Sequence, residues 1–355
     1  MNIDALDANF QTALFITFLV AITILTAKKD SGPHEMNHSH TDELKGVAIL
    51  MVIFSHIGYF LFSDHKFLYP LSVAGGVGVN IFLFLSGFGL TKSEINLKKP
   101  FLSFYFKRLR NIFIPMWFVL IPVLILDAVI LGRTYNFTIV AQSILGFFPN
   151  SDLDSAVNSP LWYFSLILFY YLLFPLVYLK KNPMLSALAV FVIGLVMVSI
   201  KLPVSVDVLK LYKLHIIAFP LGMVFACLDL GKIGVKINNL NSLVRYAAIF
   251  LLFLLFAYTA INSGVGSKIM TEQLLSLVTM SSLILIFLIK NIQSEALITL
   301  GKYSYEIYLI QWPLMYRYDF IYKYTPPFLG TLIYILLFLL IGKFLNTLVK
   351  TILKF

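Results

Sequence analysis

The apolar residues of this chain are gathered in long runs, and short polar breaks separate one run from the next. Each run is close to the roughly 20 residues that an α-helix needs to cross the hydrocarbon core of a bilayer. Two runs form a hairpin over residues 42–91. Nine further spans are predicted at about 12–26, 112–132, 160–179, 184–200, 212–228, 246–262, 273–289, 299–316 and 328–346. The pattern therefore predicts an all-α, polytopic membrane helix bundle, with a ten-helix core and one extra amino-terminal transmembrane helix.

The first helix of the hairpin carries two ionisable residues, Lys45 and His56, which are eleven residues apart and so lie on one helical face. At about 1.5 Å per residue, His56 lies roughly 16 Å beyond Lys45, near the middle of the hydrocarbon layer. An ionisable residue at that depth is costly and is a functional candidate by default. A histidine whose polar atoms bond to a neighbouring helix is the structural alternative, and the sequence leaves both interpretations open.

The second helix of the hairpin is rich in glycine. Gly76, Asn80, Leu83 and Gly87 are expected to share one face. Small residues let membrane helices approach closely, and an Asn side chain can form a hydrogen bond across the contact. Helix packing alone would account for these four residues.

The composition excludes an ordinary soluble domain. The chain has 355 residues, of which 59% are hydrophobic and 12% charged, and its mean hydropathy is +0.89. The single cysteine, Cys227, rules out a disulfide framework within one chain.

The net charge of +10 is distributed as a membrane protein distributes it, which argues against a nucleic-acid partner. With the amino terminus outside, 19 of the 27 Lys and Arg residues fall in cytoplasmic segments. This bias follows the positive-inside rule. It predicts a multi-pass protein of the cell membrane with its carboxyl terminus in the cytoplasm.

Several polar residues stand in or beside the predicted spans. We expect Glu306 and Gln311 to be paired or hydrated, because neither tolerates lipid at low cost. Asp127 lies towards the outer end of its helix, where it is expected to reach water, and His215 also lies near a helix end. The histidines of the 27–43 linker are expected to be solvated: His34, His38 and His40.

A basic cluster, Lys107, Arg108 and Arg110, enters the predicted helix at the cytoplasmic side. Such a cluster either anchors the topology and touches anionic lipid, or binds a phosphate-rich ligand through the bidentate donors of arginine.

Taken in order, five stretches of the chain resemble the acyltransferase-3 family of integral-membrane acyltransferases over about residues 42–346. They are Asp42–Gly46 with His56, Gly75–Phe88, Lys107–Pro115, Leu161–Ser165 with Tyr171 and Pro175, and Gly301–Tyr305 with Gln311. The chain departs from the family at a few positions. The family usually has Arg in place of Lys45, often Asp in place of Asn80, in some members Glu in place of Ile167 and Leu168, and in many His in place of Gln311. A mechanism that needs those Glu or His side chains cannot operate here.

The resemblance implies that residues 42–355 form a membrane acyltransferase domain, preceded by an extra transmembrane helix and cytoplasmic linker in residues 1–41. It implies transfer of an acyl group, often acetyl, from cytoplasmic acyl-CoA to a hydroxyl of a surface or exported polysaccharide or another glycan. His56 would act as general base or acyl carrier. Lys45, Arg108 and Arg110 are the candidates for binding the CoA phosphates. Weaker candidates for lining the acceptor path are Asn80, Trp162, Tyr163 and Gln311. No metal is expected.

The competing hypothesis is a transporter or flippase for a small molecule or lipid-linked sugar, since a many-helix bundle with central polar residues also suits transport. Transporters often show internal repeats with interrupted helices in both halves. The glycine-rich hairpin has no counterpart in the second half of this chain, which favours the enzyme. The acceptor, the acyl group and the oligomeric state do not follow from the sequence.

Overall fold

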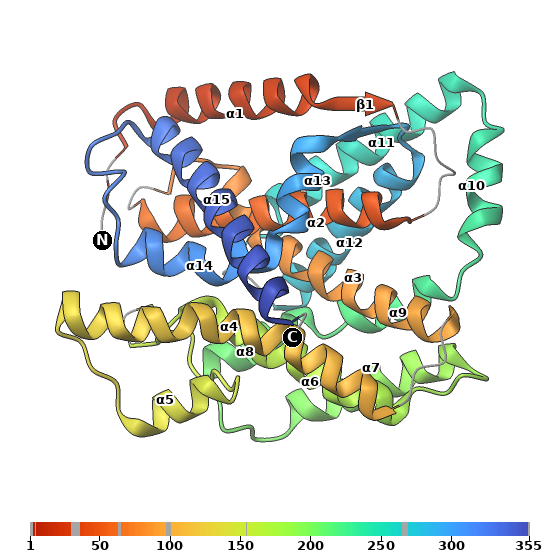
Figure 1. Ribbon diagram of the computed structural model, residues 1–355. Coiled ribbons are helices and arrows are strands. Elements are labelled where there is room, and N and C mark those ends of the chain that lie inside the picture. The colour runs from red at the N-terminus through yellow and green to blue at the C-terminus, as the bar shows by residue number, and fades with distance from the viewer. Residues whose placement is uncertain are drawn as a thin grey trace. The chain divides into compact units, whose positions relative to one another are not determined.

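The computed structural model describes residue 3 and residues 5–29, 36–62, 65–96, 101–153, 155–264 and 269–353. Regular structure in this part of the chain is almost wholly helical, apart from two three-residue strands (Figure 1). Nine helical stretches within these residues are long and apolar enough to cross a membrane. The predicted polytopic helix bundle is confirmed.

The chain packs into two compact units. The first unit comprises Met1–Leu85, Leu228–Ser304 and Tyr318–Leu339, and the second comprises Ser86–Cys227, Tyr305–Arg317 and Leu340–Phe355. Two helices, α3 (Gly75–Asn96) and α15 (Pro327–Leu353), contribute residues to both units.

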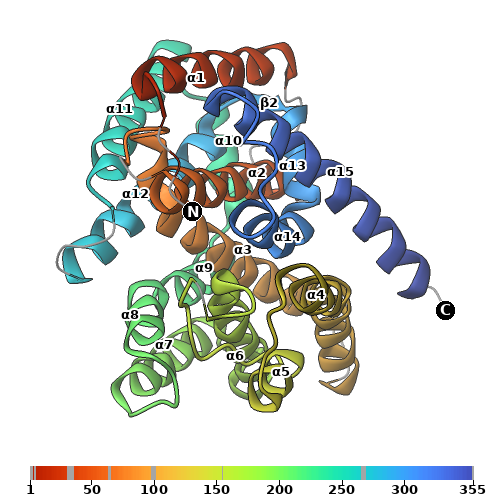
Figure 2. The ribbon, with the colours of Figure 1, turned by 90° about the vertical axis from the view of Figure 1, so that its left-hand side faces the viewer.

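The first unit is built around α2, which packs against α13, α12 and the start of the glycine-rich helix α3. A short antiparallel ladder joins β1 to β2, with Ala27 opposite Ser294. Both views show α1 lying over α2 and α13 (Figure 2). The elements of this unit, besides parts of α3 and α15, are α1 (Ala8–Leu25), β1 (Ala27–Lys29), α2 (His38–Ser55), the π-helical turn η1 (His56–Leu61), the 3₁₀ turn η2 (Leu71–Ala74), α10 (Leu230–Asn238), α11 (Ser242–Ile261), α12 (Ile269–Ile289), β2 (Ile292–Ser294) and α13 (Glu295–Lys302).

The second unit packs α6 against α4 and α7, and α7 against α9. Gly87 of α3 lies against the backbone of Phe219 in α9, so a small residue again permits a close approach between helices. The elements of this unit are α4 (Phe101–Leu131), α5 (Phe137–Ile144), the 3₁₀ turn η3 (Ser159–Leu161), α6 (Trp162–Val177), α7 (Pro183–Ser199), α8 (Val206–His215), α9 (Ala218–Ala226) and nearly all of α14 (Ser304–Tyr316), with parts of α3 and α15.

The predicted span at 299–316 is not one helix. Helix α13 ends at Lys302 and α14 begins at Ser304, with Tyr303 outside helical geometry at φ −111° and ψ 12°. The Tyr303 amide forms a short turn back to the Leu300 carbonyl. The apolar pattern runs across this break because both short helices carry apolar residues, so the pattern alone could not place it.

Two prolines of the second unit, Pro220 in the first turn of α9 and Pro313 inside α14, each leave a carbonyl oxygen without its helical donor, and a side chain donates to that oxygen instead. Pro220 has no amide hydrogen for the carbonyl oxygen of Ile216, where the predicted span at 212–228 divides into α8 and α9. The Tyr170 hydroxyl donates to that oxygen instead, at 2.9 Å. Likewise the Leu309 carbonyl oxygen, four residues before Pro313, accepts from Asn158 Nδ2 at 2.9 Å. Membrane proteins must satisfy such freed backbone groups internally.

Candidate active site

Helix α2 carries Lys45, and His56 follows its last residue as the first residue of the π-helical turn η1. Asn37 caps the start of α2, with its side chain accepting from the His40 amide at 3.0 Å, and the helix runs from His38 to Ser55. The two candidates therefore keep the spacing of about three turns that places them on one side, separated by the buried Ile49 and Val52. Lys45 is partly exposed and forms an ion pair with Asp42 at 3.0 Å.

The helical geometry changes at His56. The turn η1, His56–Leu61, is π-helical, a rare form that occurs frequently at functional sites. The His56 ring is half-buried and lies 6.1 Å from the Phe60 ring. The wider turn redirects the side chains that follow Ser55, and His56 is the first residue of this turn.

The backbones of α2 and α13 are in direct contact. A Cβ atom at Gly46 would overlap the Leu297 carbonyl oxygen, and one at Gly301 would overlap the Asp42 carbonyl oxygen. Only glycine fits at both positions. Two of the stretches singled out in the sequence, Asp42–Gly46 and Gly301–Tyr305, thus meet at one helix crossing.

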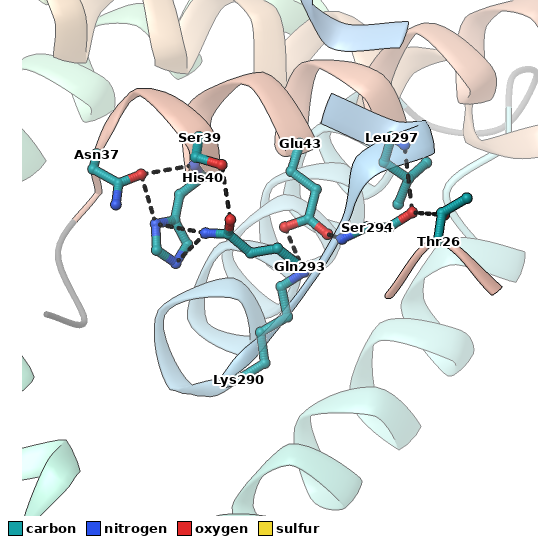
Figure 3. Close-up of polar contacts among 9 residues, drawn as sticks. All are labelled: Thr26, Asn37, Ser39, His40, Glu43, Lys290, Gln293, Ser294 and Leu297. Atoms are coloured by element: carbon teal, nitrogen blue, oxygen red, sulfur yellow. Dashed lines mark hydrogen bonds and ion pairs between the residues drawn. The ribbon is translucent and has the colours of Figure 1, made fainter. Parts of the chain in front are cut away.

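A polar cluster holds the amino-terminal end of α2 against the segment between α12 and α13 (Figure 3). The buried carboxylate of Glu43 accepts from the Ser294 amide at 2.7 Å and forms an ion pair with Lys290 at 2.6 Å. Gln293 Oε1 accepts from the Ser39 hydroxyl at 2.8 Å, and Gln293 Nε2 lies 3.4 Å from the His40 ring.

The expectation of a solvated linker is wrong at His40. Its side chain is only 1% exposed, because it belongs to the first turn of α2 and packs beside Gln293. His38 is exposed, as expected. His34 lies outside the described residues.

Asn80 of α3 is fully buried and donates to the Ser276 hydroxyl of α12 at 2.7 Å, which confirms the expected hydrogen bond between helices. The close approach of α3 to α2 occurs on another face. There a Cβ at Gly75 would lie 2.6 Å from the Ser55 side chain, and Gly78 lies against the Ala48 carbonyl oxygen. The predicted face thus holds the hydrogen bond, while Gly75 and Gly78 make the close contacts with α2.

The other candidates lie in the second unit. Arg108 and Arg110 are half-buried on α4, and the Arg110 guanidinium lies 5.4 Å from the Phe106 ring centre. Trp162 and Tyr163 begin α6. The Trp162 indole stacks on the buried His215 ring at 5.5 Å, and the Tyr163 ring meets the Tyr308 ring edge-on at 5.5 Å.

Helix α14 places two polar side chains, Glu306 and Gln311, in the interior of the second unit. Gln311 is fully buried. Glu306 accepts from Asn346 Nδ2 at 2.7 Å, which confirms the expectation that this carboxylate is paired. The bond links α14 to the carboxyl-terminal half of α15.

An ion pair that the sequence analysis missed joins α4 to the residue that follows α14. Asp127 was expected to reach water, but it is fully buried and pairs with Arg317, whose side chain is 4% exposed. The Arg317 guanidinium also donates to the Ala156 carbonyl oxygen, and the Tyr135 hydroxyl donates to Asp127 at 2.6 Å. Burial, followed by this hydrogen bond, raises the pKa of Tyr135 to about 12. The two charged residues are far apart in sequence, so no local pattern could pair them.

The structure distributes the candidates between the two units. Lys45, His56 and Asn80 belong to the first unit, and Arg108, Arg110, Trp162, Tyr163 and Gln311 belong to the second. Among the described residues, no three His, Cys, Asp or Glu side chains are grouped so that they could hold a metal ion.

Comparison with known proteins gives two matches. A family described as an acyltransferase domain of the acyltransferase-3 type matches residues 42–345. A curated O-acetyl transferase of Shigella phage Sf6 is 31% identical over 244 residues, which cover 60% of this chain and 70% of the phage protein. No solved structure matches the chain significantly.

Proposed function

The chain belongs to the acyltransferase-3 family of membrane acyltransferases, and we propose that it transfers an acetyl group from cytoplasmic acetyl-CoA to a hydroxyl of a cell-surface or exported glycan. The observation that carries the proposal is the placement of Lys45 and His56 on one continuous helical stretch, α2 followed directly by η1. A cation lies near one end of that helix, and a half-buried imidazole stands about three turns deeper, at a π-helical turn. The relative named O-acetyl transferase supports the choice of reaction and acyl group.

His56 carries the chemistry in this proposal. Its imidazole nitrogen takes the proton from the acceptor hydroxyl while the hydroxyl oxygen attacks the thioester carbonyl carbon. The carbon–sulfur bond breaks, the CoA sulfur leaves as thiolate, and the imidazolium returns the proton to that sulfur. The proton balance closes without a further base.

The remaining candidates bind the two substrates. Lys45, Arg108 and Arg110 offer the cationic donors that the phosphates of CoA require. Trp162, Tyr163, Asn80 and Gln311 remain the weaker candidates for the acceptor path, since Asn80 and Gln311 are fully buried and Trp162 stacks on His215. In this arrangement the amino terminus lies outside, and the donor-binding end of α2 and the carboxyl terminus face the cytoplasm.

The proposal is tested with purified protein in liposomes that receive radiolabelled acetyl-CoA and a mixture of surface glycans from the host. The parent is expected to transfer label, and His56→Gln is expected to lose transfer while retaining the unfolding temperature of the parent. His38→Gln is the matched control, because His38 is exposed at the start of the same helix. Full activity in His56→Gln would make His56 structural, and no transfer by the parent from any acyl-CoA would remove the proposed reaction.

A further inference from the structure

Helix α1 lies outside the residues that match the family, yet one face of it is built into the first unit. Its buried residues are Ala8, Thr12 and Phe15, which share one helical face in the amino-terminal half. The apolar side chains of its other faces are largely exposed, as lipid-facing residues would be. A helix that only anchors a chain in a bilayer needs no such buried face.

The chain on both sides of α1 forms backbone hydrogen bonds with other elements of the first unit. After its carboxyl end, β1 pairs with β2, and the Thr26 carbonyl oxygen accepts from the Glu295 amide at 3.0 Å. Before its amino end, the Ile3 amide donates to the Leu61 carbonyl oxygen at 3.2 Å. Leu61 is the last residue of η1, the turn that begins with His56. The Ile3–Leu61 hydrogen bond therefore connects the chain before α1 to the turn that carries the candidate catalytic residue.

Between its two ends, α1 makes a polar contact with the rest of the first unit through Thr12. Its buried hydroxyl oxygen accepts from the Leu68 amide at 2.9 Å, while the hydroxyl hydrogen is donated to the Ala8 carbonyl oxygen. Leu68 is fully buried and has φ of 63°, a left-handed conformation that a leucine adopts only when its surroundings enforce it. Thr12 supplies part of that enforcement.

Leu68 in turn packs on η1. A Cβ at Gly58 would overlap the Phe67 carbonyl oxygen and lie 3.3 Å from the Leu68 side chain. Gly58 is two residues from His56 in the same π-helical turn. A second contact from α1 involves the chain just before His56. There the Phe15 ring meets the Phe54 ring edge-on at 5.3 Å.

We propose that α1 is a positioning element for His56, acting through Thr12, Leu68 and Gly58 on one side and through Phe15 and Phe54 on the other. The inference rests on the proposed function, in which His56 is the reacting group. Without the Thr12 contact the Leu68 segment relaxes, the π-helical turn shifts, and the imidazole leaves the orientation that transfer needs. A displacement of about 1 Å at a reacting group is enough to lower a rate about a hundredfold.

The test compares Thr12→Val, which keeps the shape of the side chain and removes the hydroxyl, with Thr12→Ser, which keeps the hydroxyl. Thr17→Val is the matched control, since the Thr17 hydroxyl is exposed and donates to the Ala13 carbonyl oxygen of its own helix. We expect Thr12→Val to lower kcat by about tenfold or more with KM for acetyl-CoA unchanged. Thr12→Ser and Thr17→Val are expected to retain the kcat of the parent. Equal kcat in Thr12→Val and the parent would overturn the inference.

A second readout does not depend on turnover. The rate at which diethyl pyrocarbonate modifies His56, followed by mass spectrometry of fragments that separate His56 from His65, reports the surroundings of the ring. We expect this rate to change in Thr12→Val and to stay at the parent value in Thr12→Ser and Thr17→Val. If the parent shows no transfer but the rate changes in this way, the proposed function fails and the positioning by α1 stands. If transfer is present and the rate is identical in all four proteins, the positioning fails.

If Thr12→Val does not fold, Phe15→Leu replaces it, because leucine keeps the site apolar and removes the ring that meets Phe54. The same change in modification rate is expected. A folded Phe15→Leu protein with the modification rate and kcat of the parent would overturn the inference.

Discussion

The Tyr170 hydroxyl donates to the Ile216 carbonyl oxygen at 2.9 Å, four residues before Pro220. The bond satisfies a backbone acceptor that the proline leaves without its helical donor, in a region where lipid offers no substitute. Tyr170 is fully buried, and its ring stacks on Phe219 at 4.3 Å. The break between α8 and α9 is therefore stabilised by a residue of α6.

Removing this hydroxyl is expected to have an effect that depends on the proline. Tyr170→Phe should lower the free energy of unfolding by about 1–3 kcal/mol, because the Ile216 oxygen stays buried and unsatisfied. In a Pro220→Ala background the new amide can bond to that oxygen, so the loss should fall below about 1 kcal/mol. Thermal unfolding of the four proteins in detergent measures the difference. If Tyr170→Phe lowers the free energy of unfolding equally with Pro220 and with Ala at that position, the Tyr170 hydroxyl does not replace the missing amide donor.

The Glu43–Lys290 ion pair is expected to be sensitive to the loss of either partner. Lys290→Met should destabilise the protein by about 3–5 kcal/mol, since it leaves the buried Glu43 carboxylate without its counterion. Glu43→Gln should cost less, because the Lys290 side chain is partly exposed. Glu43→Gln combined with Lys290→Met should cost less than the sum of the two single changes. Unfolding temperatures provide the measurement. Lys28→Met, which breaks the exposed pair with Glu295, is the control and should change stability by at most about 1 kcal/mol.

The crossing of α2 and α13 should not accept a side chain. Gly301→Ala places a methyl group on the Asp42 carbonyl oxygen, so we expect little folded protein and no transfer. Gly89→Ala is the contrasting change, because nothing lies within 4 Å of a Cβ at that helical position. It should be neutral or stabilise by up to about 1 kcal/mol. Yield of monodisperse protein and unfolding temperature distinguish the two, and a stable Gly301→Ala protein would rule out the direct contact.

Arg317 should not be replaceable by lysine. Its guanidinium bonds to both Asp127 and the Ala156 carbonyl oxygen, and a single ammonium group cannot reproduce that planar arrangement. Arg317→Lys is expected to destabilise the second unit and to release the segment around Ala156, so that limited proteolysis cleaves near residues 155–158 sooner than in the parent. Lys210→Met breaks only an exposed pair with Asp207 and should leave the cleavage rate unchanged. An unchanged rate in Arg317→Lys would show that the segment is held by other contacts.

The hydrophobic pattern was sufficient to predict the membrane bundle, because repeated apolar runs of spanning length are typical of membrane helices and rare in soluble domains. It was also sufficient to place Lys45 and His56 on one helix face. The pattern could not find the π-helical turn at His56, since this six-residue change of helical geometry gives no periodic signal of its own. It could not pair Asp127 with Arg317 or Glu43 with Lys290, because these partners come from segments distant in sequence. The break at Tyr303 was missed for the same reason: Gly301 packs near the end of its helix against α2, which the local sequence does not reveal.

The backbones of α2 and α13 touch at their crossing, where Gly46 meets Leu297 and Gly301 meets Asp42. This crossing is a pivot point for the two helices. Because no side chains separate the two backbones at this point, the helices cannot slide past each other there. Their relative motion is confined to rotation about the crossing. Lys45 is next to the pivot and hardly moves in such a rotation. His56, ten residues beyond Gly46, is about 15 Å along the lever arm, so a turn of about 5° carries it through about 1 Å. In the proposed reaction, such a rotation would reorient the His56 imidazole relative to the acceptor while Lys45 keeps its position relative to the donor.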